Sequence, residues 1–327
     1  MKAFCYETAH PLEAFDLKVR TLNDPVPGDM DLLIDVKAFS LNPVDYKIRR
    51  SRNGTSDDPV ILGWDAAGIV LKTGKNVSGF KEGDAVFYAG DLMRPGSYAS
   101  RQAVDARLVA KKPERLSFEE AAALPLTALT AWEALFERGI TYTPQTIVLI
   151  VGGAGGVGSI AIQLLKAITP ATVIVTASRP ETKNWVKKMG ADHVMGRDLE
   201  TELARLGQPE VDVIFATTHT KDYVSLYPKI LRPFGNLCVI DDPETLDVVP
   251  FKAKAQSVHW EFMFAKSMHQ FRLESQGHIL QKIAHLVQEK RIFSTLTRSL
   301  ESTLDQLKKG HNFLENGSSC GKTVIIW

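Results

Sequence analysis

Hydrophobic and polar positions follow two different patterns along this chain. In its first part, short apolar runs are separated by turn residues such as Pro27-Gly28 and Glu82-Gly83-Asp84. These runs cover residues 1–6, 32–39, 68–71, 85–89 and 98–104. Short strands at this spacing are typical of a closed sheet, so a compact barrel-like domain is predicted here.

Helical segments interrupt and then follow this β-rich region. Asn42 and Pro43 stand where an N-cap and a first helical residue are expected, which predicts a short helical turn at residues 42–50. Further along, Ser117 and Glu120 form a capping box before an alanine-rich helix that Pro125 ends or kinks. A second helical stretch follows at residues 127–136.

From residue 146 onward, strand-like and helix-like segments alternate. The strand candidates are residues 146–151, 172–177, 192–195, 211–216 and 236–240, and the helical segments between them are 157–168, 180–189, 198–206 and 222–232. This alternation implies right-handed crossovers and a doubly wound parallel sheet of the α/β class. Residues 257–264 could add one more strand.

The end of the chain is expected to return to the first domain. Residues 277–288 form an amphipathic helical pattern and residues 323–326 a terminal strand, unlike a linker or a disordered extension. We therefore expect one domain at residues 1–120, completed by residues 265–327, and a nucleotide-binding domain at residues 121–264.

A glycine-rich loop lies between the first strand and the first helix of the alternating region. It contains Gly152, Gly153, Gly155, Gly156, Val157 and Gly158. The spacing of Gly153, Gly155 and Gly158 fits the dinucleotide fingerprint, in which backbone N–H groups and a helix N-terminus face the pyrophosphate. Such glycine patterns also occur in ordinary turns, but the flanking strand and helix favour cofactor binding.

Composition narrows the class of protein. The chain has 327 residues, 44% hydrophobic and 24% charged, with a formal net charge of +1. This balance gives no reason to expect nucleic acid or a membrane surface as a partner. No apolar run is long enough to span a bilayer, and the first ten residues lack the organisation of a signal peptide. Three scattered cysteines make a disulfide framework improbable, so a cytoplasmic location is expected.

Several motifs, taken in order, resemble the medium-chain dehydrogenase/reductase superfamily. They are Asn42–Asp45 (NPVD), Gly63–Gly68 (GWDAAG), Gly83–Val86 (GDAV), Pro125–Trp132 (PLTALTAW) and His259–Phe264 (HWEFMF), together with the glycine loop. Within that superfamily the chain is similar to the quinone oxidoreductase branch, and to a subfamily labelled zinc-type alcohol dehydrogenase-like. The resemblance implies a GroES-like barrel, a Rossmann domain and an active site in the cleft between them. It also implies a homodimer formed by edge pairing of the nucleotide-binding sheets, with residues 237–240 as the edge.

The same resemblance raises the question of zinc, and the residues argue against it. The histidine ligand of zinc-dependent members falls at Trp64, which cannot ligate, and a cysteine ligand falls at about Asn42. A later ligand falls near Leu126, and a structural zinc lobe would need more cysteines than the chain contains. We therefore expect no metal. Without a Lewis acid, an electrophilic acceptor such as a quinone or enone is favoured over a simple alcohol.

The choice of cofactor can be predicted from the end of the second strand candidate. An NAD site expects an acidic residue there, whereas this chain has Ser178 and Arg179, with Lys183 one helical turn later. Arginine and lysine suit a 2′-phosphate, so NADPH is expected, although both could also be ordinary exposed helix residues. By resemblance, Thr127 contacts the nicotinamide end. Ala216, which ends the fourth strand candidate, and Thr217, which follows it, are assigned to the same cofactor site.

Polar and aromatic candidates for the substrate come from both halves of the chain. The resemblance places Asn42 near the nicotinamide, although a simple helix cap is an equal alternative. Asp45 and Tyr46 are further catalytic candidates, Tyr46 as a proton donor to a carbonyl oxygen. Three more aromatic residues are candidates for the walls of the substrate cleft: Trp64, Phe262 and Phe264. For Phe262 and Phe264, one buried face of a strand is the alternative.

Together these features predict a zinc-independent oxidoreductase that transfers hydride from NADPH to a small electrophilic substrate. The acceptor is a quinone or an α,β-unsaturated carbonyl compound. Two alternatives remain open, namely reduction of a simple carbonyl as in alcohol dehydrogenases, and a catalytically silent NADPH-binding redox sensor.

Overall fold

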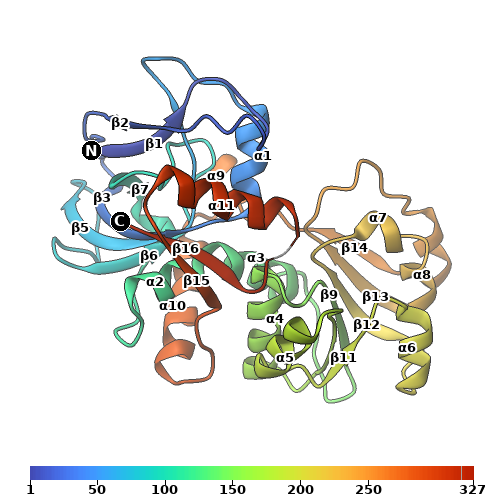
Figure 1. Cartoon of the computed structure of the whole chain (residues 1–327). Helices are drawn as coiled ribbons and strands as arrows, with labels where there is room; N and C mark the ends of the chain where they lie inside the picture. The colour runs from blue at the N-terminus through green and yellow to red at the C-terminus, as the bar shows by residue number, and fades with distance from the viewer. Residues whose placement is uncertain (318) are drawn as a thin grey trace. The chain divides into compact units, whose positions relative to one another are not determined.

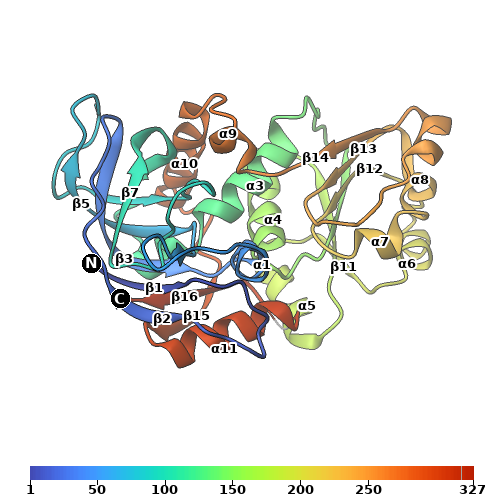
Figure 2. The same cartoon turned by 90° about the horizontal axis from the view of Figure 1, so that it is seen from above.

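The computed structural model describes residues 1–317 and 319–327 and divides into two compact units. Unit 1 comprises Met1–Leu126 with Phe264–Trp327, and unit 2 comprises Thr127–Met263. Each unit has its own sheets, which Figures 1 and 2 label.

Unit 2 is built on a six-stranded parallel sheet, which confirms the predicted doubly wound α/β class. Its strands are β9 (Ile147–Val151), β10 (Thr172–Thr176), β11 (His193–Met195), β12 (Val211–Ala216), β13 (Leu231–Val239) and β14 (Ser257–Trp260). They lie in the order β11-β10-β9-β12-β13-β14. The direction of strand addition reverses between β9 and β12, and this switch point is where open α/β sheets bind ligands.

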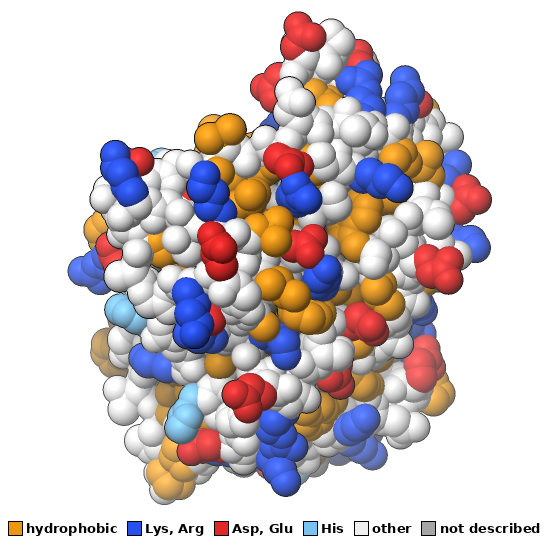
Figure 3. All heavy atoms as spheres, turned by 90° about the vertical axis from the view of Figure 1, so that its left-hand side faces the viewer, with side chains coloured by type: hydrophobic (Ala, Val, Ile, Leu, Met, Phe, Trp, Pro, Cys, Tyr) orange, Lys and Arg blue, Asp and Glu red, His pale blue; other side chains and the backbone are white. Residues whose placement is uncertain are grey.

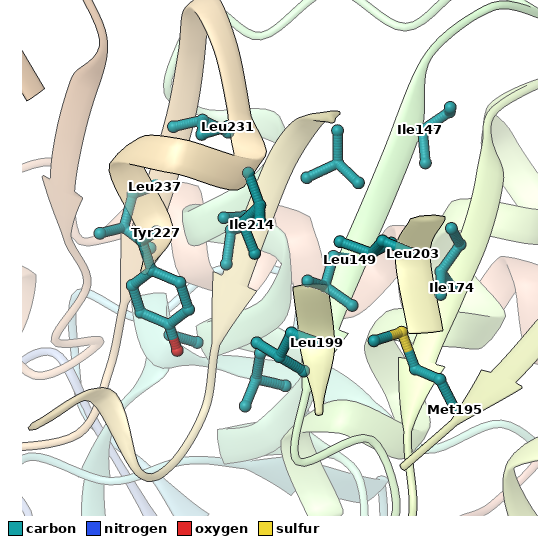
Figure 4. Packing of buried hydrophobic residues seen from close by; sticks show 14 of the residues in the cluster. Ile147, Leu149, Ile174, Met195, Leu199, Leu203, Ile214, Tyr227, Leu231 and Leu237 are labelled. Carbon is teal, nitrogen blue, oxygen red and sulfur yellow. The ribbon is translucent and has the colours of Figure 1, made fainter. Parts of the chain in front are cut away.

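Helices cover both faces of this sheet, so its central strands are buried on both sides. The helices are α3 (Pro125–Phe136), α4 (Gly156–Ile168), α5 (Pro180–Lys188), α6 (Leu199–Arg205), α7 (Thr220–Tyr223) and α8 (Tyr227–Ile230), with a 3₁₀ turn η2 (Val249–Lys254). In Figures 1 and 2, α4 lies on one side of the sheet and α6 and α8 on the other. Figure 4 shows the second face, where Leu149 and Ile214 of the sheet pack near Leu199 of α6.

Two expectations for unit 2 are wrong at the same place. The single helix expected at residues 222–232 is two short helices, and β13 already begins at Leu231. Residues between Leu231 and Asn236 leave the ladder, because Leu231 pairs with Val211 but Asn236 pairs with Val213. This irregular stretch contains Pro233 and Gly235, which hide the strand in the sequence. Residues 237–239 are not an edge either, since β13 pairs with both β12 and β14.

Unit 1 contains two sheets. A three-stranded sheet has the order β2-β1-β4, and a larger one the order β15-β16-β3-β5-β6-β8, with β7 also paired to β3. The strands are β1 (Lys2–Tyr6), β2 (Lys18–Thr21), β3 (Asp31–Ser40), β4 (Val60–Ile61), β5 (Ala66–Thr73), β6 (Ala85–Tyr88), β7 (Arg101–Asp105), β8 (Val109–Lys111), β15 (Leu296–Glu301) and β16 (Lys322–Ile326). On the face drawn in Figure 3, basic and acidic side chains are interspersed with hydrophobic ones.

The last segment of the chain belongs to unit 1. Terminal strand β16 pairs antiparallel with β3, with Val324 opposite Ser40. The helices of unit 1 are α1 (Pro43–Ser51), α2 (Phe118–Ala122), α9 (Ala265–Met268), α10 (Glu274–Gln288) and α11 (Leu304–Glu315), with a 3₁₀ turn η1 (Ala106–Leu108). In the part of the chain that the structure describes, none of the helices combines the length and apolar character needed to cross a membrane.

Candidate functional site

The loop between β9 and α4 is shaped by close backbone contacts that only glycine allows. Gly152 has φ of +86°, in the region that disfavours other residues. A Cβ on Gly153 would lie 1.8 Å from Val175 Cγ1, and one on Gly158 would lie 2.6 Å from the Gly152 carbonyl oxygen. Gly155 differs, because its Cβ would meet only that oxygen, at 3.7 Å. Gly153 and Gly158 are therefore tightly packed, whereas Gly155 has little packing beside it.

The loop lies at the switch point of the sheet, next to the end of β12. Thr217 follows β12, and its Oγ1 donates to the Val151 carbonyl at 2.8 Å. Gly155 is the N-cap of α4, so the first helical N–H groups, beginning at Gly156 and Val157, point out of the helix end. This arrangement fits the pyrophosphate of a dinucleotide, because it combines backbone N–H donors at a helix end, the positive end of the helix dipole, and Gly155, beside which there is little packing.

The residues expected at a 2′-phosphate lie where β10 meets α5. Ser178 is exposed, and Arg179 is the N-cap residue of α5. Its Nε lies 2.9 Å from Glu181 Oε1. Lys183 is exposed on the first turn of α5. Two cations at the end of β10 are thus available to an anion, and one of them already has an acidic partner that the sequence prediction did not consider.

Two other predicted cofactor residues are buried. Thr127 is 2% exposed and lies in α3, and Ala216 is fully buried at the end of β12. The side chain of Ala216 is therefore part of the core, and only its backbone lies at this end of the sheet.

A buried polar cluster in unit 1 centres on the carboxylate of Asp65. Its Oδ2 accepts from Ser40 Oγ at 2.5 Å and from Asn42 Nδ2 at 3.1 Å, and it lies 3.2 Å from Lys322 Nζ. Its Oδ1 accepts from the Leu126 N–H at 3.2 Å. Burial raises the pKa of Asp65, and the same burial lowers the pKa of Lys322. Four donors nevertheless satisfy this carboxylate well in its ionised form.

Lys322 connects Asp65 to Asn42. Its Nζ reaches three acceptors, namely the Leu41 carbonyl at 2.9 Å, Asn42 Oδ1 at 2.5 Å and Asp65 Oδ2. Three acceptors match the three protons of an ammonium group. Asn42 is therefore the N-cap residue of α1 by position, but its side chain points into this cluster instead of capping the helix.

Asp45 is hydrogen-bonded to the backbone of Asn42, whose side chain belongs to the Asp65 cluster. Its Oδ2 accepts from the Asn42 N–H at 2.8 Å and from the Tyr98 hydroxyl at 3.1 Å. Burial raises the pKa of Asp45 to about 7. His311 Nε2 lies 3.1 Å from the Tyr98 hydroxyl, and His311 Nδ1 lies 2.8 Å from Arg49 Nη1. The predicted pair of Asn42 and Asp45 is thus brought together, and Tyr98 joins it.

The other predicted site residues have no side-chain hydrogen bond to Asp65, Asn42 or Asp45 among the described contacts. Tyr46 is half-buried with the Arg50 guanidinium carbon 5.4 Å from its ring centre. Trp64 is fully buried in unit 1, where its ring packs edge-on against Phe264, also buried. Both are core side chains in this structure, so Trp64 does not line a cleft in unit 1, and Phe264 matches the alternative of buried packing. Phe262, in unit 2, is 49% exposed.

Two family models match the chain. The one described as alcohol dehydrogenase GroES-like domain matches residues 28–114, and the one described as zinc-binding dehydrogenase matches residues 156–269. Over 99% of both chains, the protein is 38% identical to a zinc-type alcohol dehydrogenase-like protein of Staphylococcus aureus. This chain belongs to the medium-chain dehydrogenase/reductase superfamily.

Within this superfamily the chain falls in the quinone oxidoreductase-like branch. It is 30% identical to 2-methylene-furan-3-one reductase of Solanum lycopersicum, over 99% of this chain and 79% of that one. It is 28% identical to the chloroplastic NADPH-dependent alkenal/one oxidoreductase of Arabidopsis thaliana, with the same coverage. The resemblance predicted from the motifs is thereby confirmed.

Solved structures of the superfamily agree with the fold. A Rhizobium etli protein provisionally named as a zinc-dependent alcohol dehydrogenase is 44% identical, with a TM-score of 0.95 over 100% of this chain and 98% of that one. The quinone oxidoreductase of Coxiella burnetii is 28% identical, with a TM-score of 0.82 over 100% of this chain and 99% of that one. The GroES-like and Rossmann architecture is therefore shown.

The positions that hold zinc in metal-dependent members of the superfamily carry other chemistry here. Asn42 presents an amide that is already bonded to Lys322 and Asp65. Trp64 donates its indole N–H to the Arg94 carbonyl at 3.3 Å. Within residues 1–317 and 319–327, no three His, Cys, Asp or Glu side chains gather as a group able to hold a metal. The donor set thus does not fit a zinc ion.

Sequence reasoning missed most partners of Asn42 and Asp45. Asp65 lies inside a motif used for the resemblance, but it was not recognised as a site residue. Lys322 directly precedes the terminal strand predicted at residues 323–326 and is the first residue of β16, where a buried lysine is unusual. Tyr98 and His311 gave no local signal, because their roles depend on which segments meet in unit 1.

Proposed function

We propose that this chain is an NADPH-dependent oxidoreductase that works without zinc and reduces quinones or α,β-unsaturated carbonyl compounds. The observation that carries the proposal is the state of Asn42 and Trp64. These two residues stand where the resemblance expects the zinc ligands of metal-dependent members. Asn42 is hydrogen-bonded to Lys322 and Asp65, and Trp64 is packed in the core. The names of the tomato and Arabidopsis relatives, both reductases of conjugated carbonyl compounds, support the same acceptor class.

The chemistry of the acceptor follows from the lack of a Lewis acid. A bound metal stabilises a developing alkoxide by several kcal/mol, so a simple ketone would lose much of its activation without one. A conjugated acceptor spreads the developing negative charge over its own π-system. The protein then has to orient the acceptor, exclude water and offer a hydrogen bond to the developing oxyanion.

The residues of unit 2 suit the cofactor. NADPH would supply the hydride. The α4 N-terminus and the glycine loop would bind the pyrophosphate, with Thr217 bracing the loop from β12. Ser178, Arg179 and Lys183 would bind the 2′-phosphate, because a serine and two cations do not repel it as an acidic residue would.

An acceptor panel tests the proposal. Purified protein is mixed with NADPH and a conjugated enone, a quinone or a saturated ketone of similar size, and cofactor oxidation and products are followed. We expect turnover with the enone or quinone, and transfer of deuterium from C4 of labelled NADPH to the β-carbon of the enone. Turnover of the ketone alone would indicate a carbonyl reductase, and tight binding without any turnover would indicate a redox sensor.

A further inference from the structure

A line of hydrogen bonds in the interior of unit 1 runs in one direction only. It begins at Arg49, a permanent cation that can donate but cannot accept. Arg49 Nη1 lies 2.8 Å from His311 Nδ1, so this nitrogen must accept. Burial, reinforced by Arg49, lowers the pKa of His311 to about 3, and the ring is neutral at ordinary pH. Its single ring proton therefore lies on Nε2.

The same direction of donation continues from His311 through Tyr98 to Asp45. Since His311 Nε2 carries a proton, it donates to the Tyr98 oxygen at 3.1 Å. The Tyr98 hydroxyl proton then has to be donated onward, to Asp45 Oδ2 at 3.1 Å. The Asn42 N–H donates to the same oxygen at 2.8 Å. Both donors thus converge on one oxygen of the carboxyl group.

The other oxygen of Asp45 is left without a donor. Asp45 is fully buried, and its Oδ1 has no hydrogen-bond partner among the described residues. Asp65 contrasts with it, because four donors reach both oxygens of that carboxylate. An ionised carboxylate with a bare, buried oxygen is costly, whereas a neutral carboxylic acid with its proton on that oxygen is much less so.

We propose that Asp45 is a neutral, buried carboxylic acid with its proton on Oδ1, and that Tyr98 and His311 are positioning residues that direct the proton to this oxygen. Through Oδ2 the acid holds the backbone of Asn42. The proposal extends to catalysis only if the proposed reductase function is correct, because Asn42 is the residue expected near the nicotinamide.

The charges around Asp45 explain why its ionisation would disturb Asn42. Lys322 on β16 is the nearby cation, but its three protons already serve Leu41, Asn42 and Asp65. A second carboxylate would compete for Lys322 and draw it away from the Asn42 amide. The other charged or titratable groups beside this line are Asp65 before β5, His10 after β1, and Glu315 on α11, which pairs with both Arg49 and Arg50 of α1.

The sign of the pH effect follows from linkage. Burial raises the pKa of Asp45 to about 7, above the ~3.9 of an unfolded aspartate, so the folded state binds one more proton between these values. The stabilisation is therefore complete below the unfolded pKa and is lost as pH rises toward the folded one. Within this window the folding equilibrium should weaken by up to about tenfold per pH unit.

Asp45→Asn is the matched variant, because its amide mimics the protonated acid. The amide oxygen can accept from Tyr98 and the Asn42 N–H, and the NH₂ group takes the place of the protonated Oδ1. We measure denaturant unfolding of the full chain from pH 4.5 to 8.5. The difference between wild type and Asp45→Asn should show the decline with pH, and the variant should match or exceed the wild type at pH 8.5. In infrared difference spectra, the carbonyl band of a protonated carboxylic acid should disappear in the variant.

Two further variants test the positioning residues. Tyr98→Phe removes a donor that favours the ionised acid, so the decline should move to higher pH. In His311→Gln the amide can still accept from Arg49 and donate to Tyr98, so stability should decline with pH at the same midpoint as in the wild type. Leucine can do neither, so His311→Leu should shift that midpoint. If the proposed reaction occurs, kcat/KM of the wild type should fall on the same alkaline limb, and Asp45→Asn should flatten it.

The outcomes separate this inference from the proposed function. The inference would be overturned if the stability difference between wild type and Asp45→Asn were constant with pH, or if the infrared band were absent. This holds whether or not the protein turns over an acceptor. A pH-dependent difference in a protein that turns over no acceptor would support the buried acid and reject the reductase.

Discussion

Arg179 is the residue at which cofactor choice can be tested most directly. Its guanidinium is paired with Glu181, and the two side chains are 41% and 63% exposed. Exposed ion pairs of this kind contribute about 0–1 kcal/mol, because water screens them and two flexible side chains are ordered. A 2′-phosphate carries more charge than one carboxylate, and it should therefore displace Glu181 from Arg179.

Arg179→Ala should weaken NADPH binding about tenfold, because a hydrogen bond to a charged group contributes ~1.5–3 kcal/mol and exposure favours the low end. NADH lacks the phosphate and should bind nearly as before. Ser178→Asp should also lose NADPH by repulsion. Glu181→Gln is the control, since it frees Arg179 and should bind NADPH slightly more tightly. Dissociation constants for both cofactors check this, and equal weakening of both by Arg179→Ala would contradict it.

At the scale of elements, the β9–α4 turn separates two roles of glycine. A Cβ at position 158 would meet backbone atoms of Gly152 and Gly153 at 2.6 Å, whereas one at position 155 has only an ordinary contact at 3.7 Å. Gly155 also has a φ of −70°, which alanine adopts without strain. The third glycine of the fingerprint is therefore needed for packing, and we infer that the second serves the approach of the cofactor.

Gly158→Ala should destabilise the protein by ~1–3 kcal/mol, because helix and strand must separate to admit a methyl group. Gly155→Ala should leave stability almost unchanged and weaken both NADPH and NADH. Thermal unfolding without cofactor and titration with each cofactor measure the two effects. If Gly155→Ala lost as much stability as Gly158→Ala, or kept full cofactor affinity, the separation of roles would be rejected.

The parallel sheet was predictable because its strands are continuous apolar runs separated by helical patterns, as at β9 and β12. β13 was mispredicted at its start, since Pro233 and Gly235 lie in an irregular stretch that reads as a turn. The polar cluster around Asp65 was harder to predict from the sequence. Asn42 and Lys322 are 280 positions apart, and only the pairing of β16 with β3 brings them together. No local pattern encodes such a contact.

At the scale of the whole molecule, metal content is the first property to measure. The donor set does not fit zinc, because Asn42 is occupied by Lys322 and Trp64 cannot ligate. We expect protein purified without chelators to contain far less than one zinc per chain, and the proposed reductase activity to survive dialysis against a chelator. About one zinc per chain, lost together with activity and restored with it, would reject the zinc-independent mechanism.

Assembly is the second such property, and we propose that the chain forms a homodimer through the nucleotide-binding sheet. Because β13 is internal, the pairing edge has to be β14 or β11, and β14 carries Trp260, which is 51% exposed. An open edge strand with exposed apolar side chains tends to associate. The carbonyl of Trp260 accepts from Arg138 at 2.9 Å, which covers one of the groups along this edge.

Trp260→Asp should therefore shift the protein toward monomers, because a charge in a paired edge is costly to bury. Val249→Asp is the matched control, since Val249 is 73% exposed but lies in η2, outside the edge. Light scattering across micromolar concentrations should give twice the chain mass for the wild type and the control, and a concentration-dependent lower mass for Trp260→Asp. A wild type that is monomeric throughout this range would contradict the dimer. A dimer that tolerates Trp260→Asp would show that pairing occurs elsewhere than at β14.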